Sequence, residues 1–390
     1  MKVLLYVWSN SYEKVLEKNL RELGFEVVVL EEKCKHYTRD LELAQKMITL
    51  VNEENIELVV SYNYLPIISM VCNTCGIQYY CWVFDSPNYT LYAKTVGYSC
   101  NHIACFDKEQ IERIKKLGVD TVYYVPLGFD QEVFKAVDAS YSCDISFLGK
   151  MYTGEYNYYD EIALPDDIRK RIDLAVERQC FEYEKDYLQE FFQMENEDKN
   201  ILLQQLQQAL SDAQLTLGDD YYEDIGYIFR SSVIDKKITV EERRILLNRI
   251  ASLPYDFRLY TGSDVSDYPV LNRRNKGYAD YYKQMPSVFA NSRINLNITL
   301  RSIRTGIPLR VVDIMGCGGF VLSNYQKELA DLLVEDKEIV LFRSLEECLD
   351  KIDYYLSHEE ERRTIALAGQ RAIIERFSYK KRLLEVLGTS

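Results

Sequence analysis

The sequence predicts an α/β protein made of two Rossmann-like domains that face each other across a cleft. Three observations support this fold class. The 390 residues exceed what one ordinary hydrophobic core can serve. Strand and helix patterns alternate in both halves of the chain, as they do in doubly wound parallel sheets. A stretch rich in Gln, Glu, Leu, Lys and Arg interrupts the second half with helical periodicity, which predicts a helical insertion.

The first domain is expected over residues 1–140. Compact apolar runs alternate there with amphipathic helical spacing, which is typical of successive βαβ units. Such units form a parallel sheet covered by helices on both faces, and ligands bind at the carboxyl ends of its strands. Strands are predicted at 2–7, 26–30, 58–61, 78–84, 102–106 and 122–125, and helices at 12–23, at 41–52, after Pro66 and at 108–117.

The second domain is expected over residues 141–378, with the helical insertion at about 164–252. Its first strand is followed by Gly149 and Lys150, at the position where doubly wound domains admit a phosphate to the backbone. The last segment, 379–390, is long enough to cross back onto the first domain as a helix. Further strands are predicted at 144–148, 257–260, 293–298, 320–322 and 339–342, and closing helices at 345–356 and 359–377.

Composition excludes several classes of function. The net charge of −14 disfavours binding to nucleic acid or to an anionic membrane surface. No apolar run is long enough for a transmembrane segment, and the ten cysteines are scattered, so a cytoplasmic protein with reduced thiols is expected. Three histidines and one isolated Cys72–Cys75 pair predict no metal site.

The strongest candidate for a ligand site lies within residues 301–323. A helix starts there after a polar loop, and free backbone amides at a helix start favour a diphosphate. Asp313 lies one helical turn beyond Arg310, where its carboxylate can accept both ribose hydroxyls. The alternative is an ordinary glycine-capped helix with a surface ion pair. The predicted donor-binding residues are Gly149, Lys150, Arg301, Arg304, Thr305, Gly306, Arg310 and Asp313.

A candidate catalytic carboxylate, Asp85, follows the strand at 78–84, where Pro87 forces the chain into a loop. It would deprotonate or orient an acceptor hydroxyl, since a general base needs correct placement first and a suitable pKa second. The alternative is an Asp that closes a local turn. The predicted acceptor-side residues are Asn10, Tyr62, Asn63 and Ser86.

Two blocks of sequence carry a family resemblance. The block INLNITLRSIRTGIPLRVVDIMGCGGFVLSNYQKEL, residues 294–329, resembles the C-terminal domain of the CgeB-like, or spore-maturation-protein-like, glycosyltransferases. The motifs WVFDSPN and PLGFD resemble the N-terminal domain often joined to it. The resemblance implies a GT-B fold with a C-terminal domain similar to glycosyltransferase families 1 and 4. It also implies metal-independent transfer, and it places Asp313 as the acidic residue that holds the donor ribose. Thr305 stands where related retaining enzymes carry a glutamate.

The expected function is therefore transfer of a hexose or N-acetylhexosamine from a nucleoside-diphosphate sugar, with a UDP-sugar favoured, to a hydroxyl acceptor such as a protein or glycan. No cofactor is expected, because the nucleotide-sugar is a substrate. The helical insertion is a candidate surface for a protein partner. Two alternatives remain open: a GT-B-like nucleotide-sugar epimerase, which the shortage of histidines disfavours, and a non-catalytic scaffold that binds a nucleotide-sugar.

Overall fold

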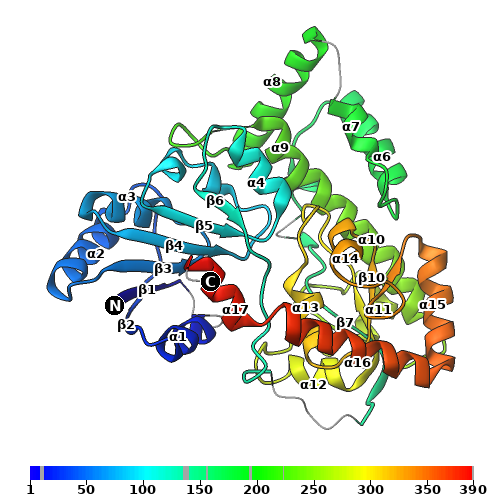
Figure 1. Ribbon diagram of the computed structural model, residues 1–390. Helices are drawn as coiled ribbons and strands as arrows, with labels where there is room; N and C mark the ends of the chain where they lie inside the picture. Colours follow the sequence, from blue (N-terminus) through cyan, green and yellow to red (C-terminus); the bar gives the residue numbers. More distant parts are fainter. Residues whose placement is uncertain (9–12, 135–139, 155–156, 193–195, 223, 389–390) are drawn as a thin grey trace.

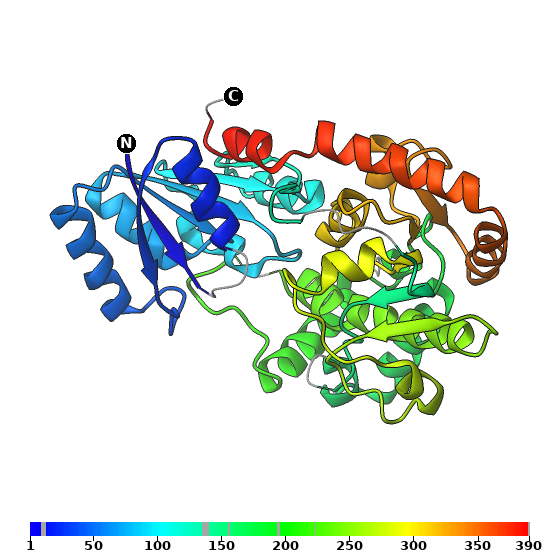
Figure 2. The same ribbon diagram turned by 90° about the horizontal axis from the view of Figure 1, so that it is seen from below.

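The computed structural model describes residues 1–8, 13–134, 140–154, 157–192, 196–222 and 224–388. It contains two parallel β-sheets, each flanked by helices, and they lie side by side with a group of helices at one end (Figures 1 and 2). The first sheet has the strand order β2-β1-β3-β4-β5-β6 and the second the order β11-β10-β9-β7-β8. Two Rossmann-like domains, as the sequence predicts, are therefore present.

The first sheet is buried on both faces, which explains why its central strands are apolar throughout. Leu5 of β1 pairs with Val29 of β2 and with Val60 of β3, and every pairing in this sheet is parallel. The strands are β1 (Lys2–Val7), β2 (Glu26–Glu31), β3 (Leu58–Tyr62), β4 (Gln78–Val83), β5 (Asn101–Cys105) and β6 (Val122–Tyr124).

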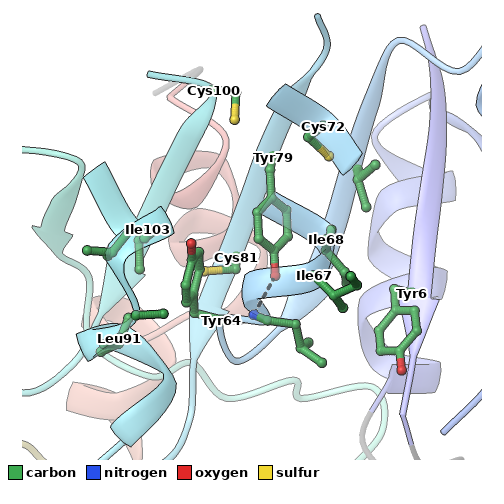
Figure 3. Packing of buried hydrophobic residues seen from close by; sticks show 14 of the residues in the cluster. Tyr6, Tyr64, Ile67, Ile68, Cys72, Tyr79, Cys81, Leu91, Cys100 and Ile103 are labelled. Atoms are coloured by element: carbon green, nitrogen blue, oxygen red, sulfur yellow. Dashed lines mark hydrogen bonds between the residues drawn. The ribbon is translucent and has the colours of Figure 1, made fainter. Parts of the chain in front are cut away.

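Helices cover both faces of the first sheet. Side chains of α2 and α3 pack on one face, and those of α1 pack on the other. Figure 3 shows part of the first layer, in which the Tyr79 hydroxyl accepts a hydrogen bond from the backbone amide of Leu65 at 3.1 Å, beside Tyr64. The helices are α1 (Glu13–Glu22), α2 (Leu41–Glu53), α3 (Pro66–Cys75) and α4 (Lys108–Lys115), with short 3-10 turns η1 (Tyr89–Tyr92) and η2 (Lys94–Gly97).

The second sheet likewise has a hydrophobic layer on each face. One layer holds residues of α10, α11 and α15, and the other holds residues of α12, α13 and α16. The strands are β7 (Cys143–Leu148), β8 (Phe257–Tyr260), β9 (Ser292–Asn297), β10 (Val321–Asn324) and β11 (Val340–Phe342). The helices are α10 (Asp235–Ala251), α11 (Pro269–Arg274), α12 (Met285–Ala290), α13 (Leu309–Gly316), α14 (Lys327–Leu332), α15 (Leu345–Ser357) and α16 (Glu359–Arg376).

The helical insertion has a hydrophobic core of its own, which Ile238 of α10 joins. The expected range of 164–252 includes α10, and Leu246, Leu247 and Ile250, farther along that helix, pack against the second sheet together with Ile145. The insertion is therefore joined to the second sheet through α10. Its elements are α5 (Tyr158–Glu161), α6 (Asp166–Gln179), α7 (Tyr187–Phe192), α8 (Asn196–Asp212), α9 (Ile225–Phe229) and the π-helical turn η4 (Arg230–Ile234).

Two segments tie the second half of the chain to the first domain. Helix α17 (Tyr379–Val386) packs on the first sheet beside α1, and the Tyr379 amide donates to the Phe129 carbonyl at 3.0 Å (Figure 1). The segment before α9 docks near η1, where the Tyr222 amide donates to the Tyr92 carbonyl at 2.7 Å. Among the described residues, no helix is long and apolar enough to cross a membrane.

Candidate active site

A pocket of about 490 Å³ opens at the carboxyl edge of β3 and β4, and Asp85 lies in its wall. Asn63 follows β3 and holds this carboxylate, because its amide donates to Asp85 Oδ2 at 2.7 Å. The side-chain oxygen of Asn63, Oδ1, accepts hydrogen bonds from the backbone amides of Phe84 and Asp85, at 2.9 and 3.1 Å. These contacts fix both the chain direction after β4 and the position of the carboxylate.

The Asp85 side chain is exposed to solvent at the pocket. Its partial burial raises the pKa of the Asp85 carboxyl above its ordinary value, while the hydrogen bond from Asn63 and the positive charge of Lys150 lower it. Lys150 follows β7 in the second domain. Leu309, the first residue of α13, also lines the pocket.

The other predicted acceptor-side residues have different surroundings. Tyr62 and Asn63 line the pocket. The Tyr62 hydroxyl is hydrogen-bonded to the Tyr379 hydroxyl of α17. Ser86 is buried and donates to Asp107, so its hydroxyl links the loop after β4 to the residue before α4. Asn10 lies outside the described residues.

In the second domain, Asp313 is buried in α13 with an exposed fraction of 1%. Its Oδ1 accepts from the Tyr281 hydroxyl at 3.2 Å. Burial raises the pKa of Asp313 to about 7, although the positive charge of Arg310 and the bond from Tyr281 oppose this shift. A buried carboxylate with one neutral donor and one cation nearby is suited to accept hydrogen bonds from a ligand.

Four cations of the second domain come from the residues after β7, from α10 and from the first turn of α13. We call Lys150, Lys236, Arg243 and Arg310 the cation group. Burial and the charge of Lys150 lower the pKa of Lys236, and burial together with the charge of Arg310 lowers the pKa of Arg243. Arg243 donates to the backbone carbonyls of Lys150 and Ile298, which places it across the ends of β7 and β9.

Sequence reasoning missed Lys236 and Arg243, because α10 was assigned to the insertion. Their spacing of seven residues puts both on one face of a helix, which is the signal that would have revealed them. Gly149, which was expected to offer its amide to a phosphate, donates that amide to the Tyr260 carbonyl at 3.1 Å instead. A Cβ at this position would lie 3.3 Å from the Phe147 ring and 3.7 Å from the Arg243 guanidinium, so only the ring would be crowded.

Arg301 and Arg304 do not join Arg310 in one cluster. Arg301 pairs with the fully buried Glu242 and donates to two carbonyls of the insertion. Arg304 pairs with Asp235 at 3.2 Å and also approaches Glu109 and Asp186. Both arginines line a second pocket of about 350 Å³ beside the insertion. Their carboxylate partners are distant in sequence, so no local pattern could have predicted these ion pairs.

Thr305 and Gly306 lie in a direct contact between the two domains. The Thr305 hydroxyl donates to Asp107 Oδ1 at 2.6 Å and accepts from the Glu109 amide at 2.8 Å. Gly306 approaches the first domain so closely that a Cβ would lie 2.5 Å from the Phe106 ring. In this structure both residues therefore lie in the contact that joins the two domains.

Helix α13 starts after Pro308, which has φ −67° and ψ 140° and is the residue before the first helical turn. The helix is eight residues long and ends at Gly316. Asp313 and Arg310 keep the i, i+3 relation that places them on one face.

The two parallel sheets, with polar side chains where their carboxyl edges meet, define the GT-B fold, in which two Rossmann-like domains face each other. Residues 242–388 match the family model described as glycosyl transferase-like. That range begins within α10 and covers the rest of the second domain and α17. A comparison with curated protein sequences finds no match.

Three solved structures with the same fold are distant from this chain in sequence. The chain is similar to Anabaena HepE in complex with UDP and glucose, with 10% identity, 100% of both chains covered and a TM-score of 0.56. It is similar to sucrose-phosphate synthase from Thermosynechococcus elongatus, with 10% identity, coverage of 100% and 98%, and a TM-score of 0.58. A glycosyltransferase from Rickettsia africae gives 11% identity, coverage of 100% and 99%, and a TM-score of 0.56. The family model and the fold together support glycosyl transfer as the class of activity.

Proposed function

We propose that the protein transfers a sugar from a UDP-sugar to a hydroxyl acceptor, as a CgeB-like glycosyltransferase. The observation that carries this proposal is a pocket shared by the two domains: Asp85 of the first domain lines it together with Leu309, the first residue of the helix that bears Arg310 and Asp313. It brings a carboxylate able to receive a proton close to cations able to receive a leaving diphosphate. The complex of HepE with UDP, a protein of the same fold, supports UDP as the nucleotide.

The donor would lie along the carboxyl edge of the second sheet. Asp313 would accept the ribose hydroxyls, and the cation group would neutralise the diphosphate as negative charge develops on it. Fixed cations around a leaving diphosphate do the work that a bound metal ion does in other transferases, which supports a reaction without a metal or other cofactor. Among the described residues, no ion pair within 4 Å engages Arg310.

In the proposed reaction, Asp85 receives the proton of the acceptor hydroxyl while that oxygen forms a bond to the anomeric carbon of the donor sugar. The bond between the anomeric carbon and the diphosphate oxygen breaks, and its electron pair remains on the diphosphate. Asn63 acts through Asp85 by holding the carboxylate in place. The transferred group is proposed to be a hexosyl or N-acetylhexosaminyl unit.

Thermal stabilisation by UDP-, GDP-, TDP- and CMP-sugars, each with EDTA, tests the donor assignment, since a ligand that binds only the folded state raises the Tm. We expect the UDP series to raise it most, with or without EDTA. Asp313→Ala should weaken binding by on the order of 2 kcal/mol, because charge-assisted hydrogen bonds to the ribose are lost. Asp350→Ala, an exposed change on α15, is the matched control.

Three outcomes would change the proposal. The absence of a shift with any nucleotide-sugar would favour the non-catalytic scaffold. Conversion of a UDP-sugar to its epimer without an acceptor would favour the epimerase. Unchanged affinity in Asp313→Ala would contradict the ribose assignment alone. A protein partner at the helical insertion remains a prediction.

A further inference from the structure

The pocket that contains Asp85 has an aromatic wall that the sequence did not indicate. Trp8, which follows β1, and Tyr37, which follows β2, stack with ring centroids 5.8 Å apart and an angle of 22° between the ring planes. Both line the pocket, together with the rings of Tyr62, Tyr64 and Phe84. Aromatic faces of this kind pack well against flat apolar groups while their polar edges remain wet.

The polar side chains of the same pocket are acidic or neutral. Besides Asp85, the wall contains Glu13, Asn63, Asn88 and Thr90. Its described lining residues include no lysine or arginine, so Glu13 and Asp85 make the wall itself acidic, and Lys150 acts on Asp85 only from outside that wall. An anionic acceptor, or the phosphate-rich backbone of a nucleic acid, would have to enter against two carboxylates with no cation in the pocket wall.

A neutral sugar ring satisfies both halves of this pocket. Its C–H face is apolar and packs on aromatic rings, and its hydroxyl edge donates hydrogen bonds to carboxylate and amide oxygens. A polypeptide acceptor would bring backbone amides and carbonyls that each need a partner, and no strand edge of the first sheet lines this pocket to supply them.

We propose that the acceptor is a neutral saccharide, with one sugar ring held between the Trp8–Tyr37 wall and Asp85. That this saccharide is the acceptor rests on the proposed transferase function. That the pocket binds a saccharide does not depend on the proposed function. Leu309 closes the pocket from the second domain at the start of α13, the helix that carries Arg310 and Asp313. A hydroxyl of the bound ring that faces Leu309 would therefore point toward the donor.

The tryptophans of the chain provide a direct test by fluorescence. The sequence contains only Trp8 and Trp82, and Trp82 lies within β4 with an exposed fraction of 1%. A ligand in the pocket should therefore change the emission of Trp8 and leave that of Trp82 unchanged. The wild type is titrated with methyl α-glucoside, methyl β-galactoside and N-acetylglucosamine, then with glucose 6-phosphate, glucuronate and a serine-containing hexapeptide. Trp8→Phe is the control, and Trp82→Phe isolates the Trp8 signal.

We expect at least one neutral sugar to give a saturable change that Trp8→Phe abolishes and Trp82→Phe retains. Binding of that sugar should weaken at least tenfold in Tyr37→Ala, and glucose 6-phosphate should bind at least tenfold more weakly than the neutral sugar. The UDP-dependent rise in Tm should be the same in Trp8→Phe as in the wild type, because the proposed donor site lies in the second domain.

The inference and the proposed function fail in different ways. If UDP-sugars raise the Tm but no neutral sugar changes the emission, the saccharide inference is wrong and the transferase proposal stands. If a neutral sugar binds and no nucleotide-sugar does, the pocket is a saccharide site of a protein that is not a transferase. Saturable binding of the peptide or of glucose 6-phosphate in preference to every neutral sugar would also overturn the inference.

Discussion

At the scale of single residues, the function depends most on Asp85 and the amide that holds it. Asp85→Asn keeps the shape of the side chain and removes its ability to accept a proton. We therefore expect the kcat for transfer to fall by about 100-fold or more, as is typical when a general base is lost. The affinity for UDP-sugar, measured by calorimetry, should stay within about twofold of the wild type.

The pH profile separates a base from a residue that only positions the acceptor. Because enclosure raises the pKa of Asp85, the carboxyl is protonated at low pH and transfer should increase as the pH rises through the raised value. Asn63→Ala should move that inflection to higher pH, since it removes a hydrogen bond that lowers the pKa of Asp85. A profile identical in wild type and Asn63→Ala would contradict the role assigned to Asp85.

Asp313 gives a second prediction at this scale, for stability. Its pKa is about 7 in the folded protein, well above the ordinary value of 3.8. A raised carboxyl pKa favours the folded state at low pH, and this contribution is lost as the pH rises from about 4 through 7. Asp313→Asn, which stays neutral, should therefore be more stable than the wild type at pH 8, by on the order of 2–4 kcal/mol, and similar to it at pH 4.

Urea unfolding of both proteins at pH 4 and pH 8 measures this difference in free energy of unfolding. Asp350→Asn provides a control at an exposed carboxylate of α15. An equal difference at both pH values would mean that Asp313 is already ionised in the folded protein. The same variant should bind UDP-sugars more weakly at pH 8, because an amide cannot replace a carboxylate that accepts two hydroxyls.

At the scale of elements, the sequence was sufficient to predict those features that arise from the local spacing of apolar and polar residues. The strands, the helices and the glycine-rich end of α13 follow from neighbouring residues, and so does the i, i+3 relation of Arg310 to Asp313. Contacts between segments that are distant in the sequence could not be predicted in this way. Arg301 meets Glu242 and Arg304 meets Asp235 only after α10 folds onto the second sheet, and no local pattern encodes that meeting.

The contact of α17 with the first domain gives a prediction for an element. Gly128 passes so close to the helix start that a Cβ would lie 2.7 Å from Tyr379 Cα and 3.3 Å from the Trp82 ring. Gly128→Ala should therefore destabilise the protein by about 1–3 kcal/mol, because the backbone or the helix must shift. Gly97→Ala is the matched control, since its Cβ would meet only Val119 at 3.7 Å.

Thermal unfolding and hydrogen exchange of α17 measure the effect. We expect a lower Tm and faster exchange over Tyr379–Val386 in Gly128→Ala, with both nearly unchanged in Gly97→Ala. If the two variants behave alike, the close approach of the chain to α17 does not contribute to stability.

At the scale of the whole molecule, the two domains are joined at several separate places. The chain passes between them before β7, α17 returns to the first sheet, and the insertion reaches the first domain through the Tyr222–Tyr92 backbone hydrogen bond. In addition, Thr305 and Gly306 contact Asp107 and Phe106, the residues that directly follow β5. The family resemblance places Thr305 where related retaining enzymes carry a glutamate, and in this structure its hydroxyl bonds to Asp107 and Glu109 of the first domain instead.

That domain contact leads to the last prediction. Thr305→Val keeps the shape of the side chain but removes the hydroxyl, so the buried Asp107 carboxylate loses one of its donors. We expect the free energy of unfolding to fall by about 1–3 kcal/mol, the cost of an unsatisfied buried polar group. Thr305→Ser, which retains the hydroxyl, should lose much less. Small-angle X-ray scattering should show a larger radius of gyration for Thr305→Val than for Thr305→Ser. The reason is that the valine variant lacks the hydrogen bond between Thr305 and Asp107 that links the two domains. Equal stability and equal dimensions in the two variants would mean that packing of Gly306 against Phe106 holds the domains together without the hydroxyl.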